Sequence, residues 1–522
     1  MERGAHSRAR LILVAMTLAN AMILVDQTAV PLAIPSILKQ FGVSSTTAQW
    51  VLNANLLTLA GLLVLGGRLG DLFGRRRMFI LGAVLFTSAS AFGGLAPNFE
   101  ILLVARVMQG AGGALLLPSS VAILSASTSS AERGRALGTM GGVAAIAGAL
   151  GPTIGGLLTS AASWRLVLLV NVPIAIVCLT VTLIAVPDDA PADAPESVDL
   201  LGALLLCVSI VALVFGLSQT QGSGFVSLPV LGALLLCAVA TVTFVLHEGR
   251  TAHPLMDLDL LGHTPNYLGA GLSQGVAGMA EMGLGLLFPL LLILNRGLSP
   301  AIAGLALIPT TVPMILLSPV AGRWYDRAGG RPPLVVGFGT LAFAGVALSL
   351  GAWGGSYWTL LPGLLLFGTG LALVLTVNDP VSLDSVSDSQ DGEVSGVSAT
   401  AEQAGGAIGI ALLYSLFHAV YLHRLTSLVD AEPGGKFSAK ESVELRDALQ
   451  AAEQTGLQPK HFDQSLLRYL QPANDASIRG YVAAFLAVTV IAVAGAVVTG
   501  ILVRRPPVLA GSDDPDAALS SE

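Results

Sequence analysis

Apolar runs of about 20 residues follow one another along almost the whole chain, and this pattern constrains the fold more than any other feature. A helix of that length crosses a hydrocarbon core of roughly 30 Å. Of the 522 residues, 53% are hydrophobic and 11% are charged, against about 25% charged in soluble domains. Because a segment in lipid must satisfy its own backbone polar groups, the runs are predicted to be α-helices. The expected fold class is an all-α polytopic membrane protein.

Fourteen spans are predicted from these runs. They cover residues 11–36, 48–68, 78–96, 101–124, 136–160, 166–186, 200–220, 227–246, 265–294, 300–321, 333–352, 357–377, 397–421 and 481–503. An even number of spans places both termini on one side, and Lys and Arg indicate which side. One face carries Arg75, Arg76, Arg77, Arg323, Arg327, Arg331, Arg504 and Arg505, whereas the short loops opposite carry only Lys39, Arg165 and Arg296. We therefore expect a protein of the cell membrane with both termini in the cytoplasm.

An internal repeat divides the chain into two halves. The loop GRLGDLFGRR, from Gly67 to Arg76, matches GRWYDRAGGR, from Gly322 to Arg331, at five of ten positions after a shift of 255 residues. Membrane transporters are often built from such repeats. We expect two pseudo-symmetric six-helix bundles, residues 1–187 and 264–503, joined by a linker with two extra helices, residues 188–263, and followed by a tail, residues 504–522. The external loop 422–479, with a capping-box spacing from Ser438 to Glu441, forms either a small helical cap or a mobile solvated loop.

One carboxylate lies deep in the first span. Asp26 stands in the run MILVDQTAVPLAIP, residues 22–35, about fifteen residues into the span. A charge inside a bilayer is costly, so an acid there is a functional-site hypothesis. The shift of 255 residues carries Asp26 onto Glu281 in the ninth span, which makes the two acids candidates to share a proton. The alternative is a polar side chain that only bonds a neighbouring helix.

Five stretches occur in order along the chain: LVDQTAVPLAIP at Leu24–Pro35, GGRLGDLFGRRR at Gly66–Arg77, LLVARVMQGAGGA at Leu102–Ala114, GALGPTIGG at Gly148–Gly156 and WRLVLLVNVPIA at Trp164–Ala175. Together they resemble the major facilitator superfamily, and specifically its fourteen-span drug:proton antiporter family, over nearly the whole chain. The chain departs from that family at Gln27, where Thr is usual, at Pro31, where Asn is usual, and at Glu402, where many relatives have a basic residue.

The resemblance implies roles for particular residues. Asp26 is expected to carry a proton, with Arg106 facing the central cavity and biasing that protonation, whereas snorkelling of Arg106 to the interface is the alternative. Glu281 and Glu402 are further candidates for the proton or substrate path. A cytoplasmic gate is expected from Gly67, Asp71, Gly74, Arg75, Arg76, Asp326 and Arg331, with simple positive-inside anchoring as the alternative. The exporter-type motif, a close-packing stripe on the fifth span, comprises Gly148, Gly151, Pro152, Gly155 and Gly156.

Other classes of protein find little support in the sequence. There is no P-loop, zinc-type cluster or G-x-S-x-G elbow in a supporting context, and no basic patch for nucleic acid. Cys178, Cys207 and Cys237 lack metal-ligand spacing, so neither an enzyme nor a metal or cofactor is expected. The predicted function is proton-coupled efflux of amphiphilic or cationic drugs by alternating access, with protons, the lipid bilayer and a small lipophilic or cationic substrate as partners of a monomer. A dedicated exporter of one self-made antibiotic or metabolite, or a lipid-handling transporter, remains the alternative.

Overall fold

The computed structural model describes residues 2–128, 130–189, 199–223, 226–251, 254–386, 391–430 and 470–504. Within these residues, fourteen helices are long and apolar enough to cross a membrane, as predicted. The first six spans are α1 (Glu2–Phe41), α3 (Trp50–Phe73), α4 (Arg75–Gly94), α5 (Phe99–Ala126), α6 (Ser130–Ala161) and the consecutive pair α7 (Arg165–Leu169) and α8 (Asn171–Ala185).

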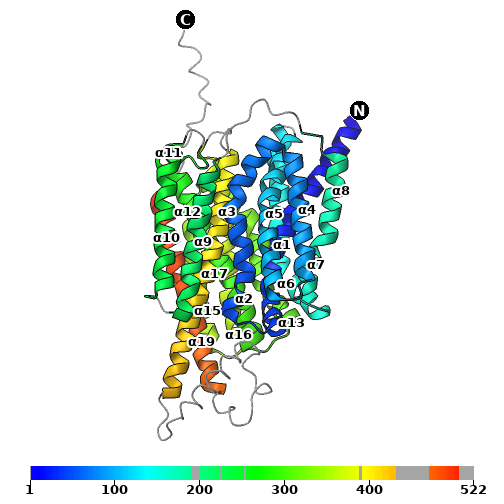
Figure 1. Ribbon diagram of the computed structural model, residues 1–522. Coiled ribbons are helices and arrows are strands. Elements are labelled where there is room, and N and C mark those ends of the chain that lie inside the picture. Colours follow the sequence, from blue (N-terminus) through cyan, green and yellow to red (C-terminus); the bar gives the residue numbers. More distant parts are fainter. Residues whose placement is uncertain are drawn as a thin grey trace.

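Eight spans follow these six. The inserted pair is α9 (Leu200–Ser223) and α10 (Leu228–Glu248). The last six are α12 (Pro265–Pro289) continued by the π-helix η1 (Leu290–Asn295), α13 (Pro300–Ala306) continued by α14 (Ile308–Ala328), α15 (Arg331–Trp353), α16 (Tyr357–Leu383), α17 (Asp391–Asp430) and α19 (Leu470–Leu502). Two short helices, α2 (Ser45–Ala48) and α11 (Leu258–His263), lie between spans. We call the end of the bundle at which α1 begins the terminal side, which is uppermost in Figure 1, and the opposite end the far side.

Several helices are longer than the sequence predicts. α1 continues through Pro31 and Pro35 to Phe41, because a proline inside a membrane helix is tolerated when neighbouring helices hold the freed carbonyl groups. α16 continues six residues beyond the predicted end, so that Asp379 belongs to the helix, whereas the sequence places it in a loop. The predicted cap from Ser438 to Glu441 lies outside the described residues.

The backbone shows the internal repeat. Gly42 and Gly297 have φ of 64° and 70°, and Gly74 and Gly329 have φ of 100° and 75°. The members of each pair are 255 residues apart, the shift that aligns the two loops. Side chains with a Cβ disfavour these angles, so both halves require glycine at the same two turns.

Helix packing repeats as well. A Cβ on Gly112 would lie 2.9 Å from the carbonyl oxygen of Gly82, and a Cβ on Gly370 would lie 2.9 Å from that of Gly337. These contacts bring α4 against α5 and α15 against α16 at the same depth. α1 packs on α6 as α12 packs on α17, and α4 packs on α8 as α15 packs on α19. The two six-helix bundles are therefore related by pseudo-symmetry, as predicted.

The halves meet along two seams. α3 packs on α17, and α6 packs on α13 and α14, which is again a symmetric pair of contacts. The inserted α9 contacts both α3 and α17, and α10 packs mainly on α9 (Figure 1). α10 leaves Leu235 and Val242 more than half exposed, an arrangement suited to a lipid-facing helix.

Candidate functional site

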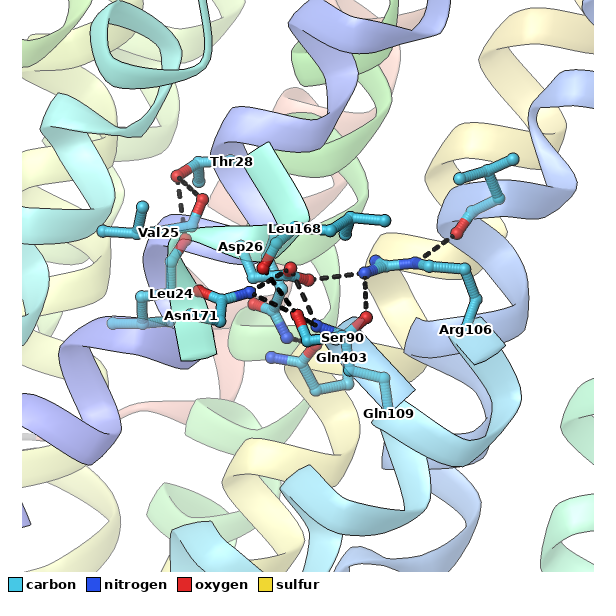
Figure 2. A network of polar contacts seen from close by, with 12 residues as sticks. Leu24, Val25, Asp26, Thr28, Ser90, Arg106, Gln109, Leu168, Asn171 and Gln403 are labelled. Atoms are coloured by element: carbon cyan, nitrogen blue, oxygen red, sulfur yellow. Dashed lines mark hydrogen bonds and ion pairs between the residues drawn. The ribbon is translucent and has the colours of Figure 1, made fainter. Parts of the chain in front are cut away.

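Asp26 lies at the centre of a closed polar network inside the first half (Figure 2). Its side chain is 1% exposed. Nη1 of Arg106 donates to Oδ2 of Asp26 at 2.6 Å. Nε2 of Gln109 and Nδ2 of Asn171 each donate to Oδ1 at 2.9 Å. An ionised carboxylate with three donors, one of them cationic, is the arrangement that a buried negative charge requires.

Arg106 is equally enclosed, with 1% of its side chain exposed. Besides Asp26, its Nη1 donates to Oε1 of Gln109 at 2.7 Å, and its Nε donates to the carbonyl oxygen of Val51 at 2.8 Å. The guanidinium therefore points into the bundle of the first half. The snorkelling alternative is wrong, because Arg106 is buried inside the bundle, and its position toward the central cavity stays a prediction. The structure does bring it to Asp26, as the resemblance implies.

Two members of this network, Ser90 and Asn171, were not predicted from the sequence. Oγ of Ser90 accepts from Asn171 at 3.0 Å and donates to the carbonyl oxygen of Leu168 at 2.8 Å. The network thus joins α1, α4, α5 and α8. A lone Asn in WRLVLLVNVPIA is a weak signal, because single uncharged polar residues are common in membrane helices as packing contacts. The structure shows why an amide is needed at position 171: Asn171 donates to the carboxylate of Asp26, which is paired with Arg106.

Gln27 connects the first half to the second. Its Nε2 donates to Oε1 of Gln403, in α17, at 3.0 Å, and the two side chains are 4% and 5% exposed. Gln403 is labelled beside the Asp26 network in Figure 2. Neighbouring residues on a helix point about 100° apart, so α1 presents Asp26 to its own half and Gln27 to the other. The departure from the family at Gln27 is thus a contact between halves.

Glu281 of α12 and Glu402 of α17 lie in the second half, outside the Asp26 network. Nε2 of Gln274 in α12 donates to Oε2 of Glu402 at 2.5 Å, and Oε2 of Glu281 is buried without a hydrogen-bond partner. No hydrogen bond joins Asp26 to Glu281 in the part of the chain that the structure describes. Asp26 of α1 points toward α5 and α8, and Glu281 stands at the matching position of α12, 255 residues later. That the two acids share a proton stays a prediction.

The exporter-type motif forms a tight helix crossing. A Cβ on Gly151 would lie 1.8 Å from Oγ1 of Thr28, and a Cβ on Gly155 would lie 2.3 Å from the carbonyl oxygen of Ala29. Oγ1 of Thr28 donates to the carbonyl oxygen of Gly148 at 2.7 Å. α6 therefore touches the turn of α1 that follows Asp26, and only glycine permits this approach.

The same helix closes the far side of the bundle. A Cβ on Gly156 would lie 2.2 Å from the carbonyl oxygen of Pro300, and a Cβ on Gly304 would lie 2.5 Å from that of Pro152. The amide of Ala301 donates to Oγ of Ser160 at 2.9 Å. These contacts join α6 of the first half to α13 of the second.

Toward the terminal side the same seam is open. A Cβ built on any of the glycines there would meet nothing within 4 Å; they are Gly138, Gly141 and Gly142 of α6 and Gly322 of α14. The two halves thus touch at the far side and separate toward the terminal side along α6 and α14.

The predicted gate loop is held within its own half. Asp189, at the end of the α8 segment, accepts from the backbone amides of Arg76 and Arg77 at 2.9 and 3.0 Å, which caps the start of α4. The Arg76 side chain pairs with Asp188. A Cβ on Gly74 would lie 2.2 Å from Asp189, so this turn needs glycine both for space and for its φ.

Gly67, Asp326 and Arg331 show no contact between halves in the described structure. Gly67 faces Pro118 of its own half, and Asp326 and Arg331 are exposed. The side chain of Asp71 lies outside the described residues. A gate that pairs the two loops across the terminal side stays a prediction.

Comparison with known proteins identifies the family. The sequence model of the Major Facilitator Superfamily matches residues 16–410. The chain belongs to the major facilitator superfamily. This confirms the family predicted from the motifs, and it makes the chain a multi-pass transporter of the membrane.

Curated relatives within the superfamily include drug-resistance proteins. The chain is 35% identical to the lincomycin resistance protein of Streptomyces lincolnensis over 425 residues, which cover 80% of this chain and 86% of that protein. It is 34% identical to the multidrug resistance protein Stp of Mycobacterium tuberculosis over 410 residues, covering 78% and 76% of the two chains.

Among solved structures, a bacterial homologue of the human lysosomal transporter Spinster, in an inward-facing and occupied conformation, superposes with a TM-score of 0.64. The match covers 93% of this chain and 95% of that one at 16% sequence identity. At this identity the likeness shows the shared superfamily fold.

Proposed function

We propose that this transporter exports lipophilic or cationic organic compounds, including antibiotics, in exchange for protons by alternating access, and that it works as a monomer in the plasma membrane. The observation that carries the proposal is the Asp26–Arg106 pair: an ionisable carboxylate, 1% exposed, on a helix that also contacts the second half. Intramembrane acids with a nearby cation are suited to proton relays. The drug-resistance relatives support the substrate class.

The network provides a way to couple protonation to movement. In this conformation Asp26 is matched by three donors and Arg106 by three acceptors. A proton on Asp26 removes its charge, and it leaves Arg106 without a counter-ion. Gln27 and Thr28 directly follow Asp26 on α1. A shift of α1 that re-solvates Arg106 therefore changes the contact of Gln27 with Gln403 and the contact of Thr28 with α6. Protonation then favours one arrangement of the halves and deprotonation the other.

The proposed orientation follows from charge. Arg68, Arg75, Arg76 and Arg77 lie at the terminal side with Arg323 and Arg327, which the positive-inside rule assigns to the cytoplasm. The conformation described, closed at the far side, is then inward-facing. One charge moved through 100 mV supplies about 2.3 kcal/mol, enough for a concentration ratio of roughly fifty.

A second candidate keeps the mechanism but narrows the substrate. The lincomycin resistance relative is named for a single antibiotic, which favours a dedicated exporter as much as a broad one. A chain of this kind would serve one compound made by its own cell.

Both candidates are tested in a strain without other exporters. The chain is expressed, and accumulation of a panel of lipophilic cations, neutral antibiotics and acidic polyketides is followed with and without an uncoupler. We expect lower accumulation of several cations, abolished by the uncoupler. A single affected compound supports the dedicated exporter, whereas efflux that survives the uncoupler contradicts proton coupling.

A further inference from the structure

A stripe of residues on α12 is built around Glu402 of α17. Gln274, Gly278 and Glu281 are four and three residues apart, which places them on one helix face. A Cβ on Gly278 would lie 2.2 Å from the backbone carbonyl oxygen of Glu402, so α17 lies directly against this face. Gln274, one turn before Gly278, donates a hydrogen bond to the Glu402 carboxylate. Glu281, one turn to the other side of Gly278, therefore faces the same place.

The stripe carries acceptor atoms without hydrogen-bond partners. Oε2 of Glu281 is buried and has no hydrogen-bond partner. Gln274 is 4% exposed, and its amide oxygen also has none. Within the described structure, the Glu402 side chain accepts a hydrogen bond from the Gln274 amide, and no described lysine, arginine or histidine forms an ion pair with either acid. Buried acceptors and charges without partners are costly, so a donor that the chain itself lacks is expected here.

The two carboxylates also act on each other. Glu402 lies within electrostatic range of Glu281, and Asp379 of α16 lies within range of Glu402. Like charges that share a site repel unless protons or an opposite charge intervene. The three acids thus form an electrostatically negative region of the second half that no cation of the described chain neutralises.

This region is partly accessible and borders the seam between the halves. Glu281 and Glu402 are half-buried, and Asp379, near the terminal end of α16, is exposed. Gln403, the neighbour of Glu402, bonds Gln27 of α1, so the α12–α17 crossing borders the seam between the halves.

We propose that Glu281, Glu402 and Gln274 form the binding site for the positively charged nitrogen of an organic cation. The carboxylates neutralise the charge, and the free amide oxygen of Gln274 accepts an N–H when the ligand has one. This inference rests on the proposed function and names its substrate class and the half that binds it. The Asp26 network of the first half, which has its own cation, is not part of this site.

The site is tested by binding of ethidium to the purified full-length chain in detergent, followed by fluorescence at neutral pH. Glu281→Gln and Glu402→Gln keep the size of each side chain and remove its charge. We expect each to weaken ethidium binding at least tenfold, while Glu281→Asp retains most of the affinity. The uncharged ring system phenanthridine is expected to compete equally well against all variants.

The matched control is Glu100→Gln, which neutralises an exposed acid in the first turn of α5. Size-exclusion profiles and helical circular dichroism establish that every variant is folded. Ethidium affinity within twofold of wild type in both Glu281→Gln and Glu402→Gln overturns the site. Binding requires no proton gradient, so a site confirmed here together with uncoupler-resistant efflux rejects only the proposed proton coupling.

Discussion

Gln109 in α5 and Phe367 in α16 occupy matching positions in the two halves, three residues before the glycines that pack alike, Gly112 and Gly370. Gln109 bonds Asp26 and Arg106. Phe367 instead contacts the ring of Phe288 with centroids 5.5 Å apart. The same backbone architecture therefore encloses a polar network in one half and an aromatic core in the other.

The second half leaves no space for a matching polar network. Ser90, which supports the Asp26 network, has Gly345 at its matching position, where a Cβ would lie 2.5 Å from the carbonyl oxygen of Phe485. No room remains there for a charged group. Glu402 instead lies at the α12–α17 crossing, within electrostatic range of Glu281. The difference teaches that a repeated backbone fold can surround its acids with different side chains in its two halves.

The largest expected effect comes from breaking the charged network. Arg106→Leu leaves Asp26 buried without its cation, which costs about 3–5 kcal/mol for a buried pair. Unfolding of the purified protein should therefore occur at much lower temperature. The double variant Asp26→Leu with Arg106→Leu should recover more than half of the loss. Arg323→Leu, an exposed arginine in α14, is the control and should leave stability unchanged. Wild-type stability of Arg106→Leu would show that the pair is not formed.

Glycine packing should be equally sensitive in both halves. Val at Gly155 would drive Cβ to 2.3 Å from the carbonyl oxygen of Ala29, and Val at Gly409 would drive it to 2.1 Å from that of Met279. Overpacking costs about 1–3 kcal/mol, and a backbone neighbour places both substitutions at the upper end. We expect the folded yield to drop for both, measured by size exclusion. Gly141→Val, with open space around it, is the control. An effect in one half alone would contradict the packing symmetry.

The bond between halves should have a moderate effect. Neutral hydrogen bonds contribute about 1 kcal/mol, which is a factor of about five in an equilibrium. Because Gln27 bonds Gln403 in the far-side-closed state, Gln27→Ala should increase far-side opening about fivefold. Thiol labelling of Ala303→Cys, at a fully buried position of α13, in a cysteine-free background, measures that opening. Adding Gln403→Ala to Gln27→Ala should increase the labelling rate little further, because the hydrogen bond is already lost. Equal labelling of Gln27→Ala and the parent would remove the bond from the coupling scheme.

The smallest effect concerns an acid outside both halves, at the start of α9. Burial acts to raise the pKa of Asp199, but the Gly202 amide and His247 outweigh it, so the pKa lies below its ordinary value. A depressed pKa stabilises the fold at neutral pH, and the contribution disappears as pH falls below about 4. Asp199→Asn should thus lower the melting temperature slightly at pH 7, and the difference from wild type should shrink as pH falls below about 4. A difference that stays constant or grows as the pH is lowered would contradict this assignment.

Much of the architecture follows from the sequence because its signals are local and strong. Spans follow from run length, and the repeat follows from loop glycines that need positive φ, such as Gly74 and Gly329. Asp26 and Arg106 attract notice because charges inside apolar runs are costly.

The direction in which each helix side chain points cannot be predicted from the sequence in the same way. A helix that is apolar all round has no amphipathic periodicity to show which side meets which neighbour. For that reason Glu281 was matched to Asp26 by position alone, and Asp379 was assigned to a loop at the polar end of α16. Gln274 and Asn171 gave no signal, since their roles exist only through the acids they contact.

The most direct test of proton coupling through the first half compares two modes of transport in the same proteoliposomes. Under the proposed mechanism a pH gradient drives net uptake of ethidium, whereas equilibrium exchange of ethidium needs no net proton movement. For Asp26→Asn we predict loss of gradient-driven uptake with exchange retained. Gradient-driven uptake at the wild-type rate by Asp26→Asn would contradict the account, because the proton would then be carried elsewhere.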